Sequence, residues 1–249
     1  MKLKSLKGYF SKFEIALWSV SLSLIIISFC VFDRSNYVTL AASLLGATSL
    51  IFNAKGNPVG QALIIVFGAL YGIVSYTFAY YGEMITYLGM TVPMAIVALV
   101  TWLKNPFKGN RAEVKVNRIS RKEIILMAAL TAVVTVAFYF ILWFFNTANI
   151  LPSTLSVTTS FIAVYLAFRR SPYFAIAYAA NDIVLIILWI LATLTDISYL
   201  SMTICFIVFL ANDIYSFINW LKMRKRQNQE ETHYPEELEY KEYGVDIGL

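Results

Sequence analysis

Apolar segments long enough to cross a membrane recur along this 249-residue chain. A helix needs about 20 residues to cross a hydrocarbon core of roughly 30 Å, because each residue adds about 1.5 Å. Segments of about this length lie at residues 15–32, 38–54, 59–80, 84–103, 124–146, 151–168, 173–194 and 198–221. Unpaired backbone groups are costly in lipid, so these segments must be helices. The sequence predicts an all-α polytopic membrane protein with eight spans.

Composition supports this class and limits the chemistry inside the membrane. Hydrophobic residues make up 59% of the chain and charged residues 14%, against roughly 25% charged residues in a soluble domain. Cys30 and Cys205 lie in separate apolar stretches, without the spacing of a disulfide or a metal site. The single histidine, His233, lies in the polar C-terminal tail. We expect no metal, no cofactor and no catalytic residues.

The basic residues predict the orientation in the membrane. With eight spans, 19 of the 20 lysines and arginines lie on one side, and Arg34 alone lies on the other. The side rich in Lys and Arg is normally cytoplasmic, so both termini and the basic loop are expected inside the cell, with the protein in the plasma membrane. These residues are at the ends of apolar runs and form no groove-like patch with aromatics, so we expect no nucleic-acid partner despite the net charge of +5.

The spans are not equivalent, and the joints between them predict an internal repeat. Lys55 is followed three residues later by Pro58, and Arg169 by Pro172 in the same way. The fourth span ends in TWLKN and the eighth in NWLKM. Two three-helix copies separated by one helix enter the membrane from the same side, as parallel repeats. The predicted division is an N-terminal segment with the first helix (1–37), repeat A (38–103), a basic cytoplasmic loop (104–123), a linker helix (124–150), repeat B (151–222) and a cytoplasmic tail (223–249).

The two ends of the chain are expected to lie outside this repeat core. The first apolar run lacks a small-x-small cleavage site, so we expect a retained helix and not a signal peptide. The tail from residue 227 onward is acidic and polar, which predicts a flexible extension.

Two acids lie deep in predicted spans, each directly after an asparagine. Asp182 and Asp213 are each nine residues from the cytoplasmic end of their span, or about 13 Å, close to the midplane. A charged residue at the bilayer centre costs roughly 2.5–3.5 kcal/mol and is usually functional. The remaining acids near the spans are expected at their edges, close to water: Glu14, Asp33, Glu83, Glu123 and Asp196.

Helical spacing groups other polar and aromatic residues with these acids. Trp189 shares a face with Asp182, while Asn212 and Tyr215 share a face beside Asp213. One interpretation is interhelical hydrogen bonding, which Asn and Asp often provide. The other is a cavity for a flat, partly polar ligand with hydroxyl groups, attracted further to the aromatics if its ring is cationic. Trp189 could serve either binding or packing.

The seventh span reads Asn181-Asp182, five apolar residues, Leu188-Trp189, which resembles the NDxxxxxLW signature of the PnuC nicotinamide riboside transporters. NDIYSFINW in the last span, KGNPVG before the third and YGE before the fourth are also similar to that family. The resemblance covers roughly residues 40–226. It implies a 3+1+3 core related to SWEET sugar transporters, facilitated diffusion of nicotinamide riboside, trapping by cytoplasmic phosphorylation, and a homotrimer in the lipid bilayer.

The resemblance also implies the substrate contacts. These would be Asn181, Asp182, Trp189, Asn212, Asp213 and Tyr215. One departure affects recognition of the nicotinamide amide: a glutamine often follows the Pro-Met of the fourth span in that family, whereas this chain has Ala95.

Several alternatives remain open at the level of sequence. Relatives on the same scaffold carry thiamine, riboflavin or deoxynucleosides, and Asp182 could instead carry an ion in a symporter. Two membrane aspartates could also form the dyad of an intramembrane protease, but those enzymes carry Gly-Asp, whereas both acids here follow asparagine. The chain has no Walker motif to couple transport directly to ATP.

Overall fold

A computed structural model describes residues 8–77, 81–147 and 149–232. Within these ranges, eight helical segments are long and apolar enough to cross a membrane, which confirms the predicted number of spans. They are α1 (Lys12–Ser28) with the π-helical turn η1 (Phe29–Asp33), α2 (Tyr37–Ala54), α3 (Pro58–Thr77), the broken span α4 (Tyr81–Thr86), η2 (Tyr87–Thr91) and α5 (Val92–Lys104), then α6 (Arg121–Phe144), α7 (Ile150–Phe168), α8 (Tyr173–Thr193) and α9 (Leu200–Thr232). His233 and the rest of the C-terminal tail lie outside the described residues.

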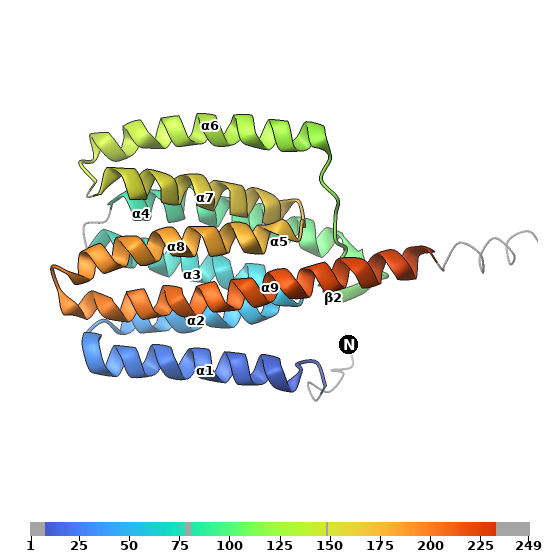
Figure 1. Cartoon of the computed structure of the whole chain (residues 1–249), viewed down its shortest axis with the longest axis horizontal. Coiled ribbons are helices and arrows are strands. Elements are labelled where there is room, and N and C mark those ends of the chain that lie inside the picture. Colours follow the sequence, from blue (N-terminus) through green and yellow to red (C-terminus); the bar gives the residue numbers. More distant parts are fainter. Residues whose placement is uncertain (1–7, 78–80, 148, 233–249) are drawn as a thin grey trace, which may run out of the picture.

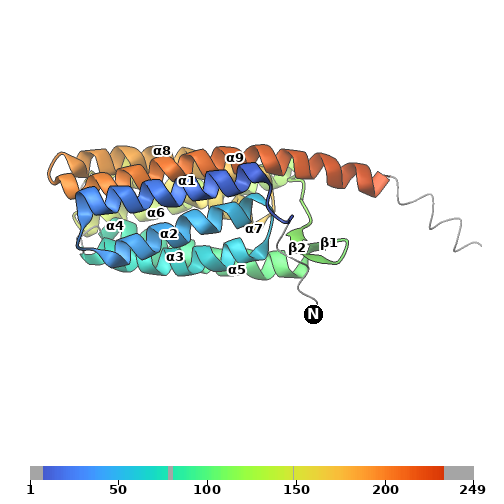
Figure 2. The same ribbon diagram turned by 90° about the horizontal axis from the view of Figure 1, so that it is seen from below.

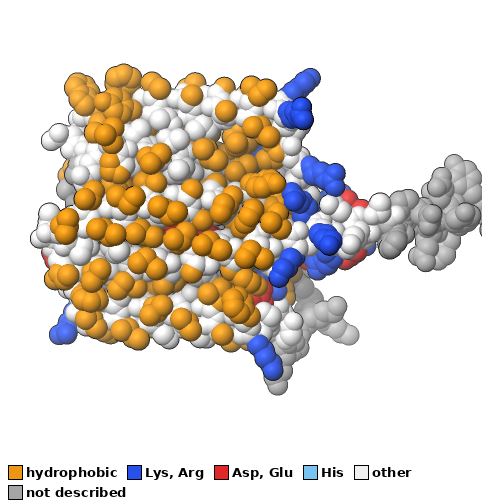
Figure 3. All heavy atoms as spheres, in the orientation of Figure 1, with side chains coloured by type: hydrophobic (Ala, Val, Ile, Leu, Met, Phe, Trp, Pro, Cys, Tyr) orange, Lys and Arg blue, Asp and Glu red, His pale blue; other side chains and the backbone are white. Residues whose placement is uncertain are grey.

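The helices run side by side along the long axis of the molecule (Figures 1 and 2). Hydrophobic side chains cover the visible lateral surface, while Lys and Arg gather at the end from which α9 projects (Figure 3). We call this the basic end. Helix α6 lies at the edge of the bundle, and its only buried residues are Thr131 and Leu142. An apolar surface of this kind is suited to contact with lipid.

Two equivalent helix ends explain how α2 and α7 turn into the next span. Gly56 and Arg170 both adopt positive φ, at +64° and +55°, directly after the C-cap. The amide of Asn57 then donates to Phe52 O and that of Ser171 to Leu166 O, both at 3.0 Å. These bonds satisfy carbonyls that would otherwise be unpaired at a helix end.

Two tryptophans pack together at the basic end. Trp102 Nε1 donates to Ala167 O at 2.8 Å, and Trp220 Nε1 donates to Asn53 O at 2.7 Å. We call α2–α5 and α7–α9 the two halves of the bundle. Each indole thus caps a helix end in the half opposite to its own, and the two ring centroids are 5.4 Å apart. These side chains are fully buried, so they fill the core between the helices at this end of the bundle.

The connection between α5 and α6 contains a small β-hairpin, β1 (Pro106–Phe107) and β2 (Asn110–Val114), beyond the helices (Figure 2). Gln227 of α9 binds it, donating to Glu113 Oε1 and Val114 O and accepting from Val116 N. The expectation that the chain becomes a flexible tail at residue 227 is therefore wrong, because α9 continues to Thr232 and buries Gln227 against the hairpin.

Candidate functional site: a cavity at the middle of the bundle

The two predicted midplane acids meet in a cavity of about 50 Å³ between the halves of the bundle. Both halves contribute to its wall. The lining residues are Gly46, Ser49 and Leu50 of α2, Ile64 and Phe67 of α3, Tyr87 and Thr91 of η2, Ser160 of α7, Tyr178, Asn181 and Asp182 of α8, and Phe206, Phe209 and Asp213 of α9. The cavity is thus polar on one side and aromatic on the other.

Asp182 and Asp213 face each other across the α8–α9 interface, close enough to share a hydrogen bond. They are 4% and 3% exposed, and Asp182 Oδ2 has no hydrogen-bond partner. Because two carboxylates offer no donor, this bond requires a proton on one of them. The pair presents an acidic group and an unused acceptor to the cavity.

Asn181 lines the cavity and also ties α8 to α7. Its Oδ1 accepts hydrogen bonds from Thr159 at 2.8 Å and Ser160 at 3.0 Å. Interhelical bonding and cavity lining are therefore not exclusive at this residue. The hydroxyls of α7 fix the orientation of the amide beside Asp182.

An aromatic layer closes the other side of the cavity. A Cβ at Gly46 would lie 2.4 Å from the Phe209 ring, so only glycine allows this ring to approach α2. Phe67 contacts Phe209, Tyr71 and Tyr87, at centroid distances between 5.6 and 5.9 Å. Interlocked rings of this kind must move before a larger ligand can be accommodated.

Trp189 lies beyond this layer and not beside Asp182. Its Nε1 donates to the Tyr71 hydroxyl at 3.0 Å, and the Tyr71 ring lies 4.4 Å from that of Tyr87. Trp189 lines a separate cavity of about 20 Å³, together with Glu83. Trp189 thus contacts Tyr71, whose ring packs on Tyr87 of the cavity wall, and does not itself line the cavity of the acid pair.

The prediction that the acids at span edges lie near water is wrong for Glu83 and Glu14. Glu83 is 6% exposed and hydrogen-bonds Ser156, while its Oε2 has no partner. Glu14 is 2% exposed because it caps α1 through Ser11 and forms an ion pair with Lys55 at 3.2 Å. Partner groups from other helices, which a single span does not reveal, bury both acids.

Asn212 and Tyr215 face α1 and do not line the cavity. Asn212 Nδ2 donates to Ser21 Oγ at 2.9 Å, and the Tyr215 hydroxyl donates to Glu14 Oε1 at 2.9 Å. The sequence placed them on a face beside Asp213, but the neighbour of that face is the N-terminal helix. Their role as substrate contacts stays a prediction, although neither residue lines this cavity.

Sequence reasoning missed the contribution of the fourth span. Thr91 lines the cavity with an unpartnered hydroxyl, and Tyr87 adds its ring. Both belong to the π-helical turn η2, which precedes Pro93. The combination of Gly89 and Pro93 in an apolar span was the available signal, because interrupted membrane helices often form binding sites.

A buried polar and aromatic cavity between two halves of a polytopic helical bundle is typical of a membrane transporter of small solutes. No group of acids, histidines or cysteines that could hold a metal occurs among the residues with described positions. The wall offers carboxyl, amide, hydroxyl and aromatic groups, and no lysine or arginine.

Comparison with known proteins agrees with this class and identifies the family. The nicotinamide mononucleotide transporter family matches residues 36–222. The chain belongs to this family. It is 28% identical to the nicotinamide riboside transporter PnuC of Neisseria mucosa over 232 residues, covering 90% of this chain and 87% of the relative. The crystal structure of the vitamin B3 transporter PnuC superposes with a TM-score of 0.77 at 26% identity, covering 88% of this chain and 95% of that one. The resemblance to PnuC is thereby confirmed.

Proposed function

We propose that this protein carries nicotinamide riboside across the plasma membrane by facilitated diffusion, with trapping by phosphorylation in the cytoplasm. The relative and the solved structure named above support this substrate, since both align over most of their length. The observation that carries the proposal is the acid pair Asp182–Asp213 in a cavity without basic residues.

The chemistry of the wall favours the riboside over its phosphorylated form. The nicotinamide ring of the riboside is cationic, so it is attracted to aromatic faces and to an acidic pair. The ribose hydroxyls can donate to Asp182 Oδ2, which has no hydrogen-bond partner among the described residues. A phosphate group would be repelled by the same acids and would find no cation at this depth. We propose Asn181, Asp182, Asp213 and Thr91 as substrate contacts.

The size of the cavity indicates a closed state. A pocket for a small molecule usually measures roughly 300–1,000 Å³, several times the 50 Å³ observed. Movement of Phe209 and Phe67 would enlarge the cavity toward α2. Trp189 and Glu83, which lie beyond Tyr71, would then meet the substrate on its way to the acid pair.

We further propose that the core consists of two parallel three-helix repeats, at residues 38–103 and 151–222, joined by α6. Support comes from the reciprocal indole bonds of Trp102 and Trp220 and from the matching positive-φ residues Gly56 and Arg170. Asn53 and Ala167, the two carbonyl acceptors, each lie five residues before a proline. A homotrimer, which the resemblance implies, stays a prediction. Cross-linking in native membranes would give the number of subunits.

Uptake into proteoliposomes is the direct test of the substrate. Labelled nicotinamide riboside should accumulate to equilibrium, while thiamine, riboflavin and a deoxynucleoside should not. A protonophore should leave the rate unchanged, whereas collapse of uptake would favour an ion-coupled symporter. External nicotinamide mononucleotide competing as strongly as the riboside would contradict the proposal.

The orientation has a separate test based on single cysteines in a background with Cys30 and Cys205 replaced. Arg111 in the hairpin and Thr195 after α8 are exposed and lie at opposite ends of the bundle. A membrane-impermeant maleimide added to intact cells should label Thr195→Cys and not Arg111→Cys. The reverse pattern would place the basic end outside.

A further inference from the structure

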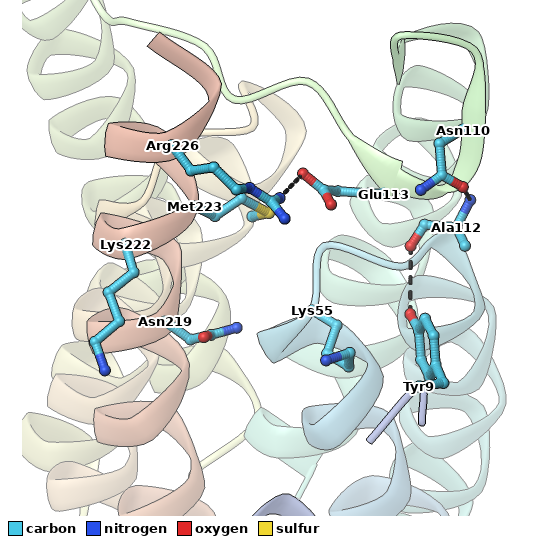
Figure 4. A pocket seen from close by; sticks show the side chains of 9 residues that line it. All are labelled: Tyr9, Lys55, Asn110, Ala112, Glu113, Asn219, Lys222, Met223 and Arg226. Carbon is cyan, nitrogen blue, oxygen red and sulfur yellow. Dashed lines mark hydrogen bonds and ion pairs between the residues drawn. The ribbon is translucent and has the colours of Figure 1, made fainter. Parts of the chain in front are cut away.

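A second and larger cavity lies at the basic end, outside the midplane site. Its volume is about 320 Å³, within the range of small-molecule pockets. Four parts of the chain line it: Tyr9 before α1, Lys55 after α2, the hairpin at Asn110, Ala112 and Glu113, and α9 at Asn219, Lys222, Met223 and Arg226. In Figure 4, Asn219 and Arg226 extend from α9 toward the hairpin and the end of α2.

The charge of this cavity is opposite to that of the midplane site. Three cations, Lys55, Lys222 and Arg226, line it beside a single acid, Glu113. Lys222 forms no ion pair with any residue in the described part of the chain, and its side chain is exposed. Lys222 therefore adds a positive charge to the cavity that no described residue pairs with.

The existing ion pairs show how an anion would be held. Glu113 pairs with Arg226 at the mouth of the cavity, and Glu14 pairs with Lys55 at 3.2 Å on the α1 side. Arg226 is half exposed, so its bond to Glu113 is partly solvated and readily exchanged. A phosphate group offers a guanidinium the same bidentate geometry as a carboxylate but a higher charge.

The wall opposite α9 is rigid. The Tyr9 hydroxyl donates to Ala112 O at 3.3 Å and accepts from Asn57 Nδ2 at 2.9 Å. Lys55 Nζ lies 4.9 Å from the centroid of the Tyr9 ring, which fixes its ammonium group beside the cavity. Of the three cations, Lys55 is thus already positioned beside the cavity.

We propose that this cavity binds a phosphorylated compound, with the phosphate group between Arg226 and Lys55, and with Lys222, which lines the same cavity and extends along α9 (Figure 4), adding positive charge. The phosphate could belong to a soluble mononucleotide or to an anionic lipid headgroup, and the volume accommodates either. The inference does not rest on the proposed transport activity, because binding here can be measured without transport.

Binding to the purified full-length protein in detergent tests the proposal. Calorimetry at fixed ionic strength would use nicotinamide mononucleotide and inorganic phosphate. Nicotinamide riboside, which lacks the phosphate group, is the control ligand, and its binding should not depend on Lys222 or Arg226. The mononucleotide should bind the wild type, and the Lys222→Gln, Arg226→Gln double variant should weaken its binding roughly tenfold or more. Lys225→Gln removes an equally basic residue of α9 that does not line the cavity, and should change affinity less than twofold.

Glu113→Gln provides a change of opposite sign. It releases Arg226 while retaining a side-chain acceptor for Gln227 Nε2, so mononucleotide affinity should rise. Equal weakening by Lys225→Gln and by the double variant would overturn the site, because it would indicate non-specific attraction. Weakening by Asp182→Asn alone would also overturn it, by moving phosphate binding to the midplane.

A lipid arm separates the two sources of phosphate. Nanodiscs of phosphatidylcholine with and without phosphatidylglycerol should stabilise the protein equally if the ligand is soluble. Stabilisation by phosphatidylglycerol that is lost in the double variant and retained in Lys225→Gln assigns the site to a headgroup. If neither the mononucleotide, inorganic phosphate nor phosphatidylglycerol binds in a manner that depends on Lys222 and Arg226, the proposal is wrong.

Discussion

The midplane cavity and the cavity at the basic end differ in charge, size and accessibility. The first measures about 50 Å³, is lined by two acids and closed by aromatic rings. The second measures about 320 Å³ and is lined by three cations with one acid. The ligands that we propose for the two cavities are therefore opposite in charge, a cationic ring for the first and an anionic phosphate for the second.

The difference shows what each environment permits. Inside the bundle a charge is costly, so the acids share a hydrogen bond and expose only one unused acceptor. At the basic end water screens the ion pairs, so several cations can lie close together and exchange partners. A phosphate added to the substrate after transport would change which of the two sites it fits.

The largest expected effect concerns the acid pair itself. Asp182→Leu should reduce riboside affinity roughly ten- to a hundredfold, because a hydrogen bond to a charged group contributes about 1.5–3 kcal/mol. The Asn variant should be intermediate, since it keeps shape and part of the hydrogen bonding. Thermal stability of the Leu variant should stay close to that of wild type, because the gain from replacing a buried acid by an apolar residue offsets the hydrogen bond that Asp213 loses. A fall in stability with normal affinity in the surviving protein would make Asp182 structural.

The closed state of the midplane cavity can be tested at Gly46. An added Cβ would lie 2.4 Å from Phe209, and overpacking of this kind costs about 1–3 kcal/mol. Gly46→Ala should therefore lower uptake roughly tenfold. Recovery by Phe209→Leu in the Gly46→Ala background would show that the ring is the obstacle, and an unchanged loss in this double variant would refute it.

A smaller effect is expected at Trp189, which contacts Tyr71 and does not line the cavity of the acid pair. Trp189→Ala removes the contact with Tyr71 and should weaken riboside binding about two- to tenfold, the range of one aromatic pair. Trp189→Phe should recover part of the loss if the ring stacks on substrate. If Trp189→Phe recovers neither affinity nor stability, the indole hydrogen bond to Tyr71 is the important contact instead.

The smallest effect should come from the face of α9 that is turned to α1. Tyr215→Phe deletes the hydrogen bond to Glu14 and should cost about 0.5–1.5 kcal/mol of stability. Riboside affinity should stay within twofold of wild type. A tenfold loss of affinity without loss of stability would show that Tyr215 contacts the substrate.

Most of the fold was predictable, because length, apolarity and the distribution of basic residues are local properties of the chain. The eight spans and the common depth of Asp182 and Asp213 follow from counting residues along helices. The rotation of each helix about its axis does not, since it depends on its neighbours. Asn212 and Tyr215 were assigned to the cavity for this reason, although α1 packs against their face.

The parts that sequence reasoning missed involve partners distant in the chain. Glu14 is buried through Lys55 and Tyr215, which lie 41 and 201 residues away. The π-helical turn that brings Thr91 to the cavity requires a backbone irregularity that apolar patterning does not encode. Residues 227–232 looked disordered by composition, yet hydrogen bonds with the hairpin extend α9 through them.

The continuity of α9 has a mechanical consequence. The helix runs without interruption from Leu200 to Thr232, so Asp213 and Gln227 are joined by a stiff rod about 21 Å long. Tilting this rod to enlarge the midplane cavity would shift its far end, where Gln227 holds the hairpin by three hydrogen bonds. The hairpin belongs to the segment that joins α5 to α6, so a tilt of α9 at the midplane would displace this segment at the membrane surface.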